Sequence, residues 1–193
     1  MIDCIYDQAW PFYNGIAKVG FADRFSRLSY IYINKNGSAL TQATYQSAQS
    51  FYNSSAVVRI NWKEGFINDR GELFISAIYE FANPFSEDIA AVELAKNNWT
   101  FINNKGNIIS QLEHGINIFK RYRYDEFNRW NLSCFSEGLI VVEKHDKYGF
   151  ANAAGDLVIL AIYDKVSGFS EGLAVVRACL GIVFGSSGYP LQH

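Results

Sequence analysis

The chain has 193 residues, of which 49% are hydrophobic and 16% aromatic, and its formal net charge is -2 at pH 7. This apolar content is enough for a sizeable buried core. The slightly negative charge argues against a general polyanion binder, because domains that bind nucleic acid are usually basic. We therefore expect no nucleic-acid partner.

Targeting and redox signals are few. No basic segment leads into an apolar stretch at the N-terminus, as a signal or transit peptide requires. No uninterrupted apolar run approaches the ~20 residues of a membrane-spanning helix. The three cysteines, Cys4, Cys134 and Cys179, are odd in number and far apart, which favours reduced thiols over a disulfide framework. The sequence thus predicts a soluble cytoplasmic protein without a membrane partner.

One pattern recurs along the whole chain: a Tyr, an aromatic residue that usually follows six positions later, an apolar run, and Asn-x-x-Gly. The Tyr positions are Tyr6, Tyr45, Tyr79, Tyr124 and Tyr163. The turns are 34–37, 68–71, 103–106 and 152–155, and Gly replaces Asn in 185–188. Such a period is typical of solenoids, propellers and repeat arrays. We expect a single domain, 1–193, with copies at about 5–40, 41–74, 75–109, 120–159 and 160–193.

The apolar runs within each copy predict short antiparallel strands. First strands are expected at 16–19, 56–58, 89–92, 139–142 and 173–176, second strands at 30–33, 65–67, 99–102 and 148–151, and a third strand at 157–160. The runs are broken by Gly and Asn at short intervals and lack helical spacing. Asn-x-x-Gly predicts a type I turn followed by a left-handed Gly, the usual three-residue hairpin connection with a bulge. Each copy is therefore predicted to be a meander of three strands plus a connector that carries the Tyr.

These residues carry a family resemblance. The sequence Tyr-Asp-x-x-x-x-Phe-Ser-Glu-Gly-Leu-Ala-Val-Val at 163–176, with Tyr-Gly-Phe-Ala-Asn-x-x-Gly at 148–155, resembles the WG repeat (WG-containing, or KWG) family of mostly bacterial β-repeat proteins. The Trp-Gly pair itself departs from the pattern, as Glu64-Gly65, Trp99-Thr100, Tyr148-Gly149 and Tyr30-Ile31. The resemblance implies an all-β binding or scaffolding module and no catalytic residues.

Two architectures satisfy this pattern. Five WG-like repeats of antiparallel meanders can stack as an open β-solenoid or superhelix, in which each copy contacts only its neighbours. A closed five-bladed β-propeller is the alternative, because the connector around each Tyr can supply the fourth strand that a blade normally has. The sequence favours the open solenoid without deciding closure.

The repeat is interrupted once at length, by an insertion at about 109–134. Gly106 and Tyr124 are eighteen residues apart, and Tyr124 and Phe135 are eleven apart. Insertions in repeat proteins map to loops on one face, often the binding face. This one concentrates cationic and aromatic residues, which are enriched at interaction hot spots. The candidate binding residues are His114, Lys120, Arg121, Tyr122, Arg123, Arg129 and Trp130. A solvated capping loop is the alternative interpretation.

No catalytic or metal-binding constellation is visible. The recurrent Glu87, Glu137 and Glu171 occupy equivalent places in successive copies, so we interpret them as turn carboxylates that accept backbone N–H bonds. The three histidines lack ligand spacing, and neither a metal nor another cofactor is expected. We predict a non-catalytic protein-interaction or scaffolding module whose partner has an acidic surface. The alternative is a carbohydrate or small-ligand binder that uses aromatic grooves between repeats.

Overall fold

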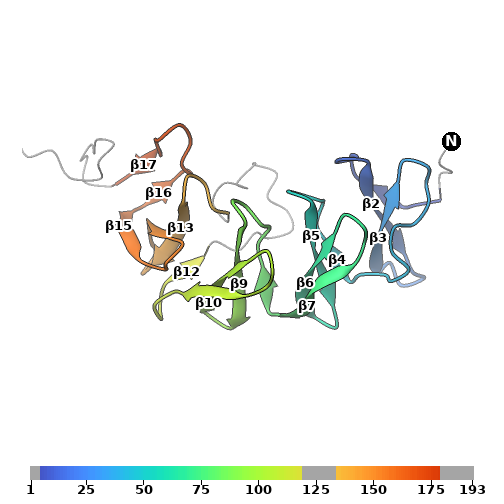
Figure 1. Ribbon diagram of the computed structural model, residues 1–193, viewed down its shortest axis with the longest axis horizontal. Helices are drawn as coiled ribbons and strands as arrows, with labels where there is room; N and C mark the ends of the chain where they lie inside the picture. Colours follow the sequence, from blue (N-terminus) through green and yellow to red (C-terminus); the bar gives the residue numbers. More distant parts are fainter. Residues whose placement is uncertain (1–4, 119–133, 179–193) are drawn as a thin grey trace, which may run out of the picture. The chain divides into compact units, whose positions relative to one another are not determined.

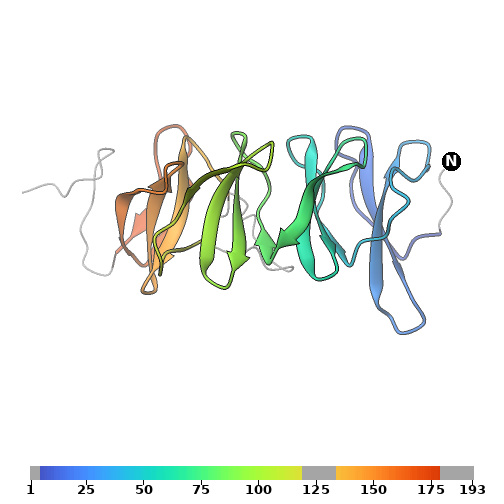
Figure 2. The same ribbon diagram turned by 60° about the horizontal axis from the view of Figure 1, so that its bottom comes forward.

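The computed structural model describes residues 5–118 and 134–178. All regular structure in these residues is β-strand, as predicted, and the described part includes no helix of the length and apolarity that a membrane crossing requires. The residues group into two compact units, 1–84 and 85–193, and each unit is described by itself. The sheets are antiparallel meanders of neighbouring strands (Figures 1 and 2).

Unit 1 contains two sheets, β1-β2-β3 and β4-β5-β6-β7. Its strands are β1 (Gln8–Ala9), β2 (Ile16–Ala22), β3 (Leu28–Asn34), β4 (Ser47–Ala48), β5 (Ser55–Ile60), β6 (Lys63–Asn68), β7 (Leu73–Tyr79) and β8 (Phe81–Ala82). One buried cluster joins the two sheets: Tyr32, Val58 and Ile67 are fully enclosed in it. Neighbouring copies therefore share one core, as expected of a repeat array.

Unit 2 has the same organisation. Its strands are β9 (Ile89–Ala95), β10 (Asn98–Asn103), β11 (Ile108–Gln111), β12 (Asn117–Ile118), β13 (Leu139–Lys144), β14 (Lys147–Asn152), β15 (Leu157–Tyr163), β16 (Lys165–Val166) and β17 (Val176–Arg177). Strands β9, β10 and β11 form one meander, β12-β13-β14-β15 form a second sheet, and β16 pairs with β17. The core includes Trp99, Phe101 and Phe150, each at most 1% exposed.

All four Asn-x-x-Gly turns within the described residues have the predicted geometry. In the first, the Gly37 N–H donates to the Asn34 carbonyl at 2.9 Å, and the Asn34 side-chain oxygen accepts from the N–H groups of Asn36 and Ser38. Gly37 has a φ of 82°, a left-handed conformation that glycine adopts without steric strain. The prediction of a left-handed Gly at this position is confirmed.

A second kind of turn, the two-residue turn, precedes each first strand. It spans 13–16, 52–55, 86–89, 136–139 and 170–173. Its outer residues exchange both backbone hydrogen bonds, and both central residues have positive φ, as in Glu137 (54°) and Gly138 (76°). This is the geometry of a type I′ hairpin turn, whose twist matches that of the strands it joins.

The glycine of the Trp-Gly position has a steric cause. In β14 and β15, Tyr148 faces Tyr163 and Phe150 faces Ile159, so residues 160–162 of β15 stand opposite Gly149 alone. A Cβ at Gly149 would lie 2.7 Å from the Ala161 nitrogen, inside van der Waals contact. Where Thr100 replaces this glycine, it pairs with Gln111 and the ladder has no bulge there. Glycine thus lets the third strand bulge toward the second.

One predicted element lies elsewhere than expected. Strand β12 pairs with Glu143 and Val142, as β4 pairs with the equivalent Arg59 and Val58. The connector of this copy is therefore at 117–118, not at Tyr124, and Tyr124 lies outside the described residues. The next repeat aromatic follows the end of the connector strand by three positions in the second copy, from Ala48 to Phe51, but by seventeen in the fourth, from Ile118 to Phe135. The additional residues thus follow β12.

Candidate functional site

Most of the sequence-predicted binding loop lies outside the described residues. These are Lys120, Arg121, Tyr122, Arg123, Arg129 and Trp130. His114 is exposed in the turn that closes with a hydrogen bond from the Ile116 N–H to the Glu113 carbonyl. The hypothesis that these residues form a recognition loop stays a prediction.

The repeated turn carboxylates join one copy to the next. The Glu87 carboxylate accepts hydrogen bonds from the backbone N–H groups of Glu137, at 2.6 Å, and of Gly138, at 2.9 Å. The Glu137 carboxylate in turn accepts one from the Gly172 N–H at 2.9 Å. Positive φ at both central residues turns these N–H groups outward as an anion-binding nest. The interpretation of Glu87 and Glu137 as turn carboxylates is confirmed.

The repeat aromatics contact the preceding copy. Phe135 meets Phe101 edge to face with centroids 4.9 Å apart, and Phe169 meets Phe150 in the same way at 4.9 Å. In unit 1, Phe51 meets Tyr32 at 5.0 Å. Edge-to-face pairs of this kind add to the stabilisation from burial. These rings serve packing between copies.

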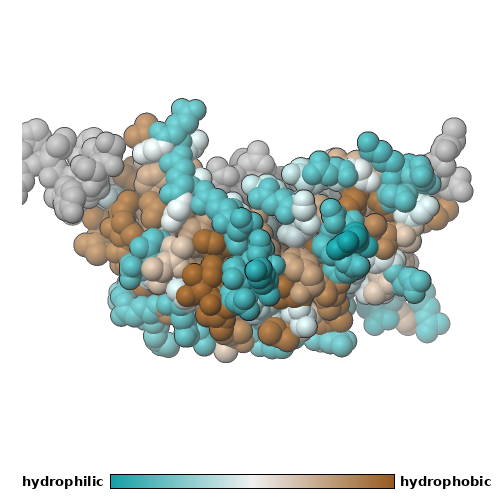
Figure 3. Space-filling view, viewed as in Figure 1, coloured by the Kyte–Doolittle hydropathy of each residue, from teal (hydrophilic) through white to brown (hydrophobic). Residues whose placement is uncertain are grey.

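The third strands expose apolar residues that no described strand covers. Strand β15 is last in its sheet, and its side chains alternate between partly buried and exposed. Val158, Leu160 and Ile162 are 55%, 64% and 47% exposed. We call these three residues the β15 ridge, and apolar surface is visible over this strand in Figure 3. Strands β7 and β11 show the same feature, with Ile78 56% and Ile108 64% exposed.

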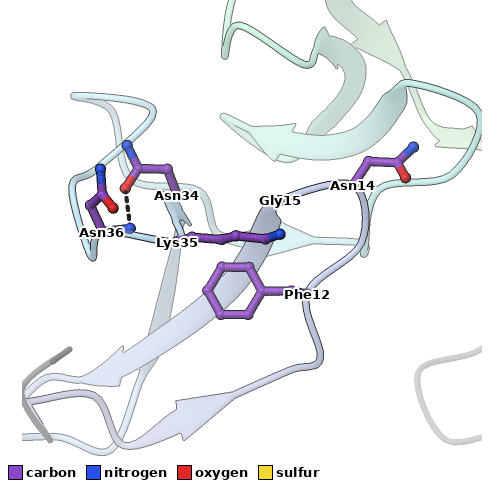
Figure 4. Close-up of a pocket in the computed structure, with 6 residues that line it drawn as sticks. All are labelled: Phe12, Asn14, Gly15, Asn34, Lys35 and Asn36. Atoms are coloured by element: carbon purple, nitrogen blue, oxygen red, sulfur yellow. Dashed lines mark hydrogen bonds between the residues drawn. The ribbon is translucent and has the colours of Figure 1, made fainter.

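A hollow of about 520 Å³ lies in unit 1 between the two turns of the first copy. We call it the turn pocket, and its lining residues are Phe12, Asn14, Gly15, Asn34, Lys35 and Asn36. Figure 4 shows the Lys35 side chain extending from the Asn-x-x-Gly turn past the Phe12 ring, toward the two-residue turn. The Lys35 Cε atom would lie 3.9 Å from a Cβ placed on Gly15.

Three donor groups of the turn pocket lack partners in the part of the chain that the structure describes, whereas the Asn34 side-chain oxygen is engaged by the Asn36 and Ser38 N–H groups. The outer residues of the turn, Tyr13 and Ile16, bond to each other, while the N–H groups of Asn14 and Gly15 have no hydrogen bond there. Lys35 likewise forms neither a hydrogen bond nor an ion pair within these residues. The pocket combines two free donors with one positive charge, and none of the described residues that line it is acidic.

A buried carboxylate occupies the aromatic position of the second copy. Glu64 accepts from the Arg59 guanidinium at 2.5 Å and from the Ala82 N–H at 2.7 Å. Burial raises the pKa of the Glu64 carboxyl, against the lowering effect of Arg59 and of the Ala82 N–H. Both oxygens are engaged inside the protein, so this group is a structural ion pair. Among residues 5–118 and 134–178, no group of three His, Cys, Asp or Glu side chains is placed to hold a metal ion.

Sequence reasoning missed both the turn pocket and the β15 ridge. A signal existed for the ridge, because Leu157-Val-Ile-Leu160 is apolar on both faces of its strand. For the pocket, the signal was Lys35 at a position that is Asp69, Asn104 or Ala153 in the second, third and fourth copies.

A comparison with protein families identifies the same repeat. The model of the WG containing repeat matches residues 1–21, 32–63, 65–98 and 148–178, which is more than half of the chain. No curated protein matches the sequence. The matched segments include two-residue turns, Asn-x-x-Gly turns and the bulge-forming glycines of the described copies. The chain belongs to the WG containing repeat family.

Proposed function

We propose that this protein is a non-catalytic repeat module that binds a protein partner, and that an extended segment of the partner pairs with strand β15. The supporting observation is the β15 ridge. An edge strand has a row of backbone groups without a strand partner, and a peptide can add to it as a further strand. Alternating exposed side chains then supply specificity.

Ordinary edge strands are protected against such pairing. Proteins usually place charges, proline or a strong bulge on an exposed edge. Residues 157–162 of β15 contain neither a charge nor a proline, and the bulge opposite Gly149 is turned toward β14. An uncharged aliphatic edge in water promotes association, so a bound partner strand explains its composition better than solvent exposure does.

A peptide selection tests this proposal directly. Random 12-residue peptides displayed on phage are selected on the wild-type protein and then ranked by fluorescence anisotropy. We expect peptides with apolar residues at alternate positions, and amide hydrogen exchange should slow in β15 when they bind. Leu160→Lys should weaken their binding by at least about tenfold, because a charge at the centre of an apolar contact is desolvated.

His145→Lys is the matched control, since His145 is exposed in the turn between β13 and β14. It adds the same side chain away from the ridge, so binding should be unchanged. Peptides that bind Leu160→Lys as tightly as the wild type would exclude β15 as the site. A wild-type dimer that Leu160→Lys converts to a monomer would replace the partner strand with a second copy of the chain.

A further inference from the structure

We propose that the turn pocket of the first copy is a binding site for a carboxylate group. The site is separate from the β15 ridge and stands on different observations. Its donors are the backbone N–H groups of Asn14 and Gly15, and its positive charge is the Lys35 ammonium.

The first observation is that the equivalent turns of this chain already bind carboxylates. In the fourth copy, Glu137 and Gly138 occupy the places of Asn14 and Gly15, and their N–H groups hold the two oxygens of Glu87 at 2.6 and 2.9 Å. In the fifth copy, the Gly172 N–H holds Glu137 at 2.9 Å. Asn14 and Gly15 have φ values of 46° and 85°, close to the 54° and 76° of Glu137 and Gly138. The same nest therefore exists in the first copy.

The second observation concerns the lysine. Asn104 in the third copy occupies the position of Lys35, and its side-chain amide is 3.4 Å from the carboxylate of Asp88. Asp88 in turn occupies the position of Gly15. In the third copy an amide thus faces a carboxylate carried by the turn itself. In the first copy the turn carries no carboxylate, and the facing residue is a cation.

These two features define the ligand. A nest of two N–H groups binds the two oxygens of a carboxylate, and Lys35 neutralises its charge from the side. The Phe12 ring, 43% exposed, forms an apolar wall beside the lysine. Because none of the described lining residues is acidic, none of them competes with a ligand for Lys35. The carboxylate can be a glutamate or aspartate side chain of another protein or a free small organic acid.

Backbone amide signals of the ¹⁵N-labelled protein report binding at this site. The probes are sodium acetate and the capped peptide Gly-Gly-Glu-Gly-Gly, each against sodium chloride at the same ionic strength. We expect saturable downfield shifts of the Asn14 and Gly15 amide protons with the carboxylates alone. A response to acetate alone identifies a small-acid site, whereas tighter binding of the peptide identifies a protein ligand.

Gly15→Asp provides an internal competitor, and the structure indicates that it folds. Asp88 already has a φ of 62° at the equivalent position, so aspartate is compatible with this turn. The new carboxylate would face Lys35 as Asp88 faces Asn104 and should abolish the response. Gly15→Asn is the matched control, because it fills the same space at the same φ without a charge, and it should retain the response.

Lys35→Gln should weaken peptide binding by up to about fivefold, as expected when an exposed ion pair is removed. Lys105→Gln, in the Asn-x-x-Gly turn of the third copy, should have no effect. Equal shifts with sodium chloride, or an undiminished response in Gly15→Asp, would overturn the proposal. Leu160→Lys should leave this response unchanged, so the failure of one proposed site does not imply failure of the other.

Discussion

Replacing Gly149 by alanine tests the steric explanation of the Trp-Gly position. The added Cβ would meet the Ile159 carbonyl oxygen and lie 2.7 Å from the Ala161 nitrogen and 2.8 Å from the Leu160 carbonyl carbon. All of these atoms belong to the backbone of β15, so no side-chain rotation relieves the contact. The third strand must move away, which weakens its pairing with β14 around Phe150 and Ile159.

Two contributions determine how much Gly149→Ala lowers the free energy of unfolding. Overpacking of a core position costs about 1–3 kcal/mol, and each backbone hydrogen bond that is lost adds about 0.5–1.5 kcal/mol. We expect Gly149→Ala to lower the free energy of unfolding by about 3 kcal/mol, which corresponds to a fall in Tm of roughly 6–12 °C for a chain of this size. Urea denaturation followed by circular dichroism, together with a thermal melt, measures both quantities.

Gly138→Ala separates steric contact from backbone strain in the same copy. Gly138 has a φ of 76°, but a Cβ there meets nothing within 4 Å. Its cost should be about 1 kcal/mol, the strain of a left-handed alanine. If the two variants were equally stable, the bulge of β15 would not be the reason for glycine at position 149.

Four further substitutions have defined outcomes. Burial raises the pKa of the Glu64 carboxyl above its ordinary 4.5, so the folded state holds this proton more tightly than the unfolded state does. The stability advantage of the wild type over Glu64→Gln, measured as the difference between their free energies of unfolding, should therefore fall as pH rises from 4.5 through the raised pKa. Urea denaturation of both proteins across this pH range measures the difference. A constant difference would contradict the raised pKa. Glu87→Ala removes two hydrogen bonds to the next copy and should lower the free energy of unfolding, measured by urea denaturation, by about 1–2 kcal/mol. Glu171→Ala should leave this free energy unchanged, because the Glu171 carboxylate has no partner among the described residues. The buried Thr100 hydroxyl has no hydrogen bond within the described residues. Thr100→Val should therefore raise Tm, because the loss of an unsatisfied buried polar group stabilises the folded state by about 1 kcal/mol. A lower Tm would show that the hydroxyl has a partner.

The strands and turns were predictable because the information for them is local. Asn34 and Gly37 specify a turn through the Asn side chain and the φ of the Gly, and the same pair recurs in the second, third and fourth copies. The second strands extend beyond the predicted ranges by one or two residues at each end, as in Lys147–Asn152 for the predicted 148–151. Periodicity added the order of the elements.

The fourth connector was misplaced because its Tyr signal is missing. Ile116, 1% exposed, is the buried residue just before β12, whereas Tyr45 and Tyr163 lead into β4 and β16. The turn at 113–116 also adds one residue before the connector strand. Tyr124 satisfied the sequence pattern, but no spacing rule identified the strand that pairs with Val142.

The turn pocket was not predictable from residue types, since its principal donors are backbone groups. The same main-chain turn serves two purposes, depending on what faces it. Where the preceding copy supplies a glutamate, as Glu87 does for Glu137 and Gly138, the nest joins copies and contributes to stability. Where no carboxylate of the described residues reaches the N–H groups, as at Asn14 and Gly15, the same donors have no partner among those residues, and we propose that they bind a ligand. The binding role that we propose for the first copy therefore depends on the side chains that face the turn, because its backbone φ values are close to those of the turn at Glu137 and Gly138.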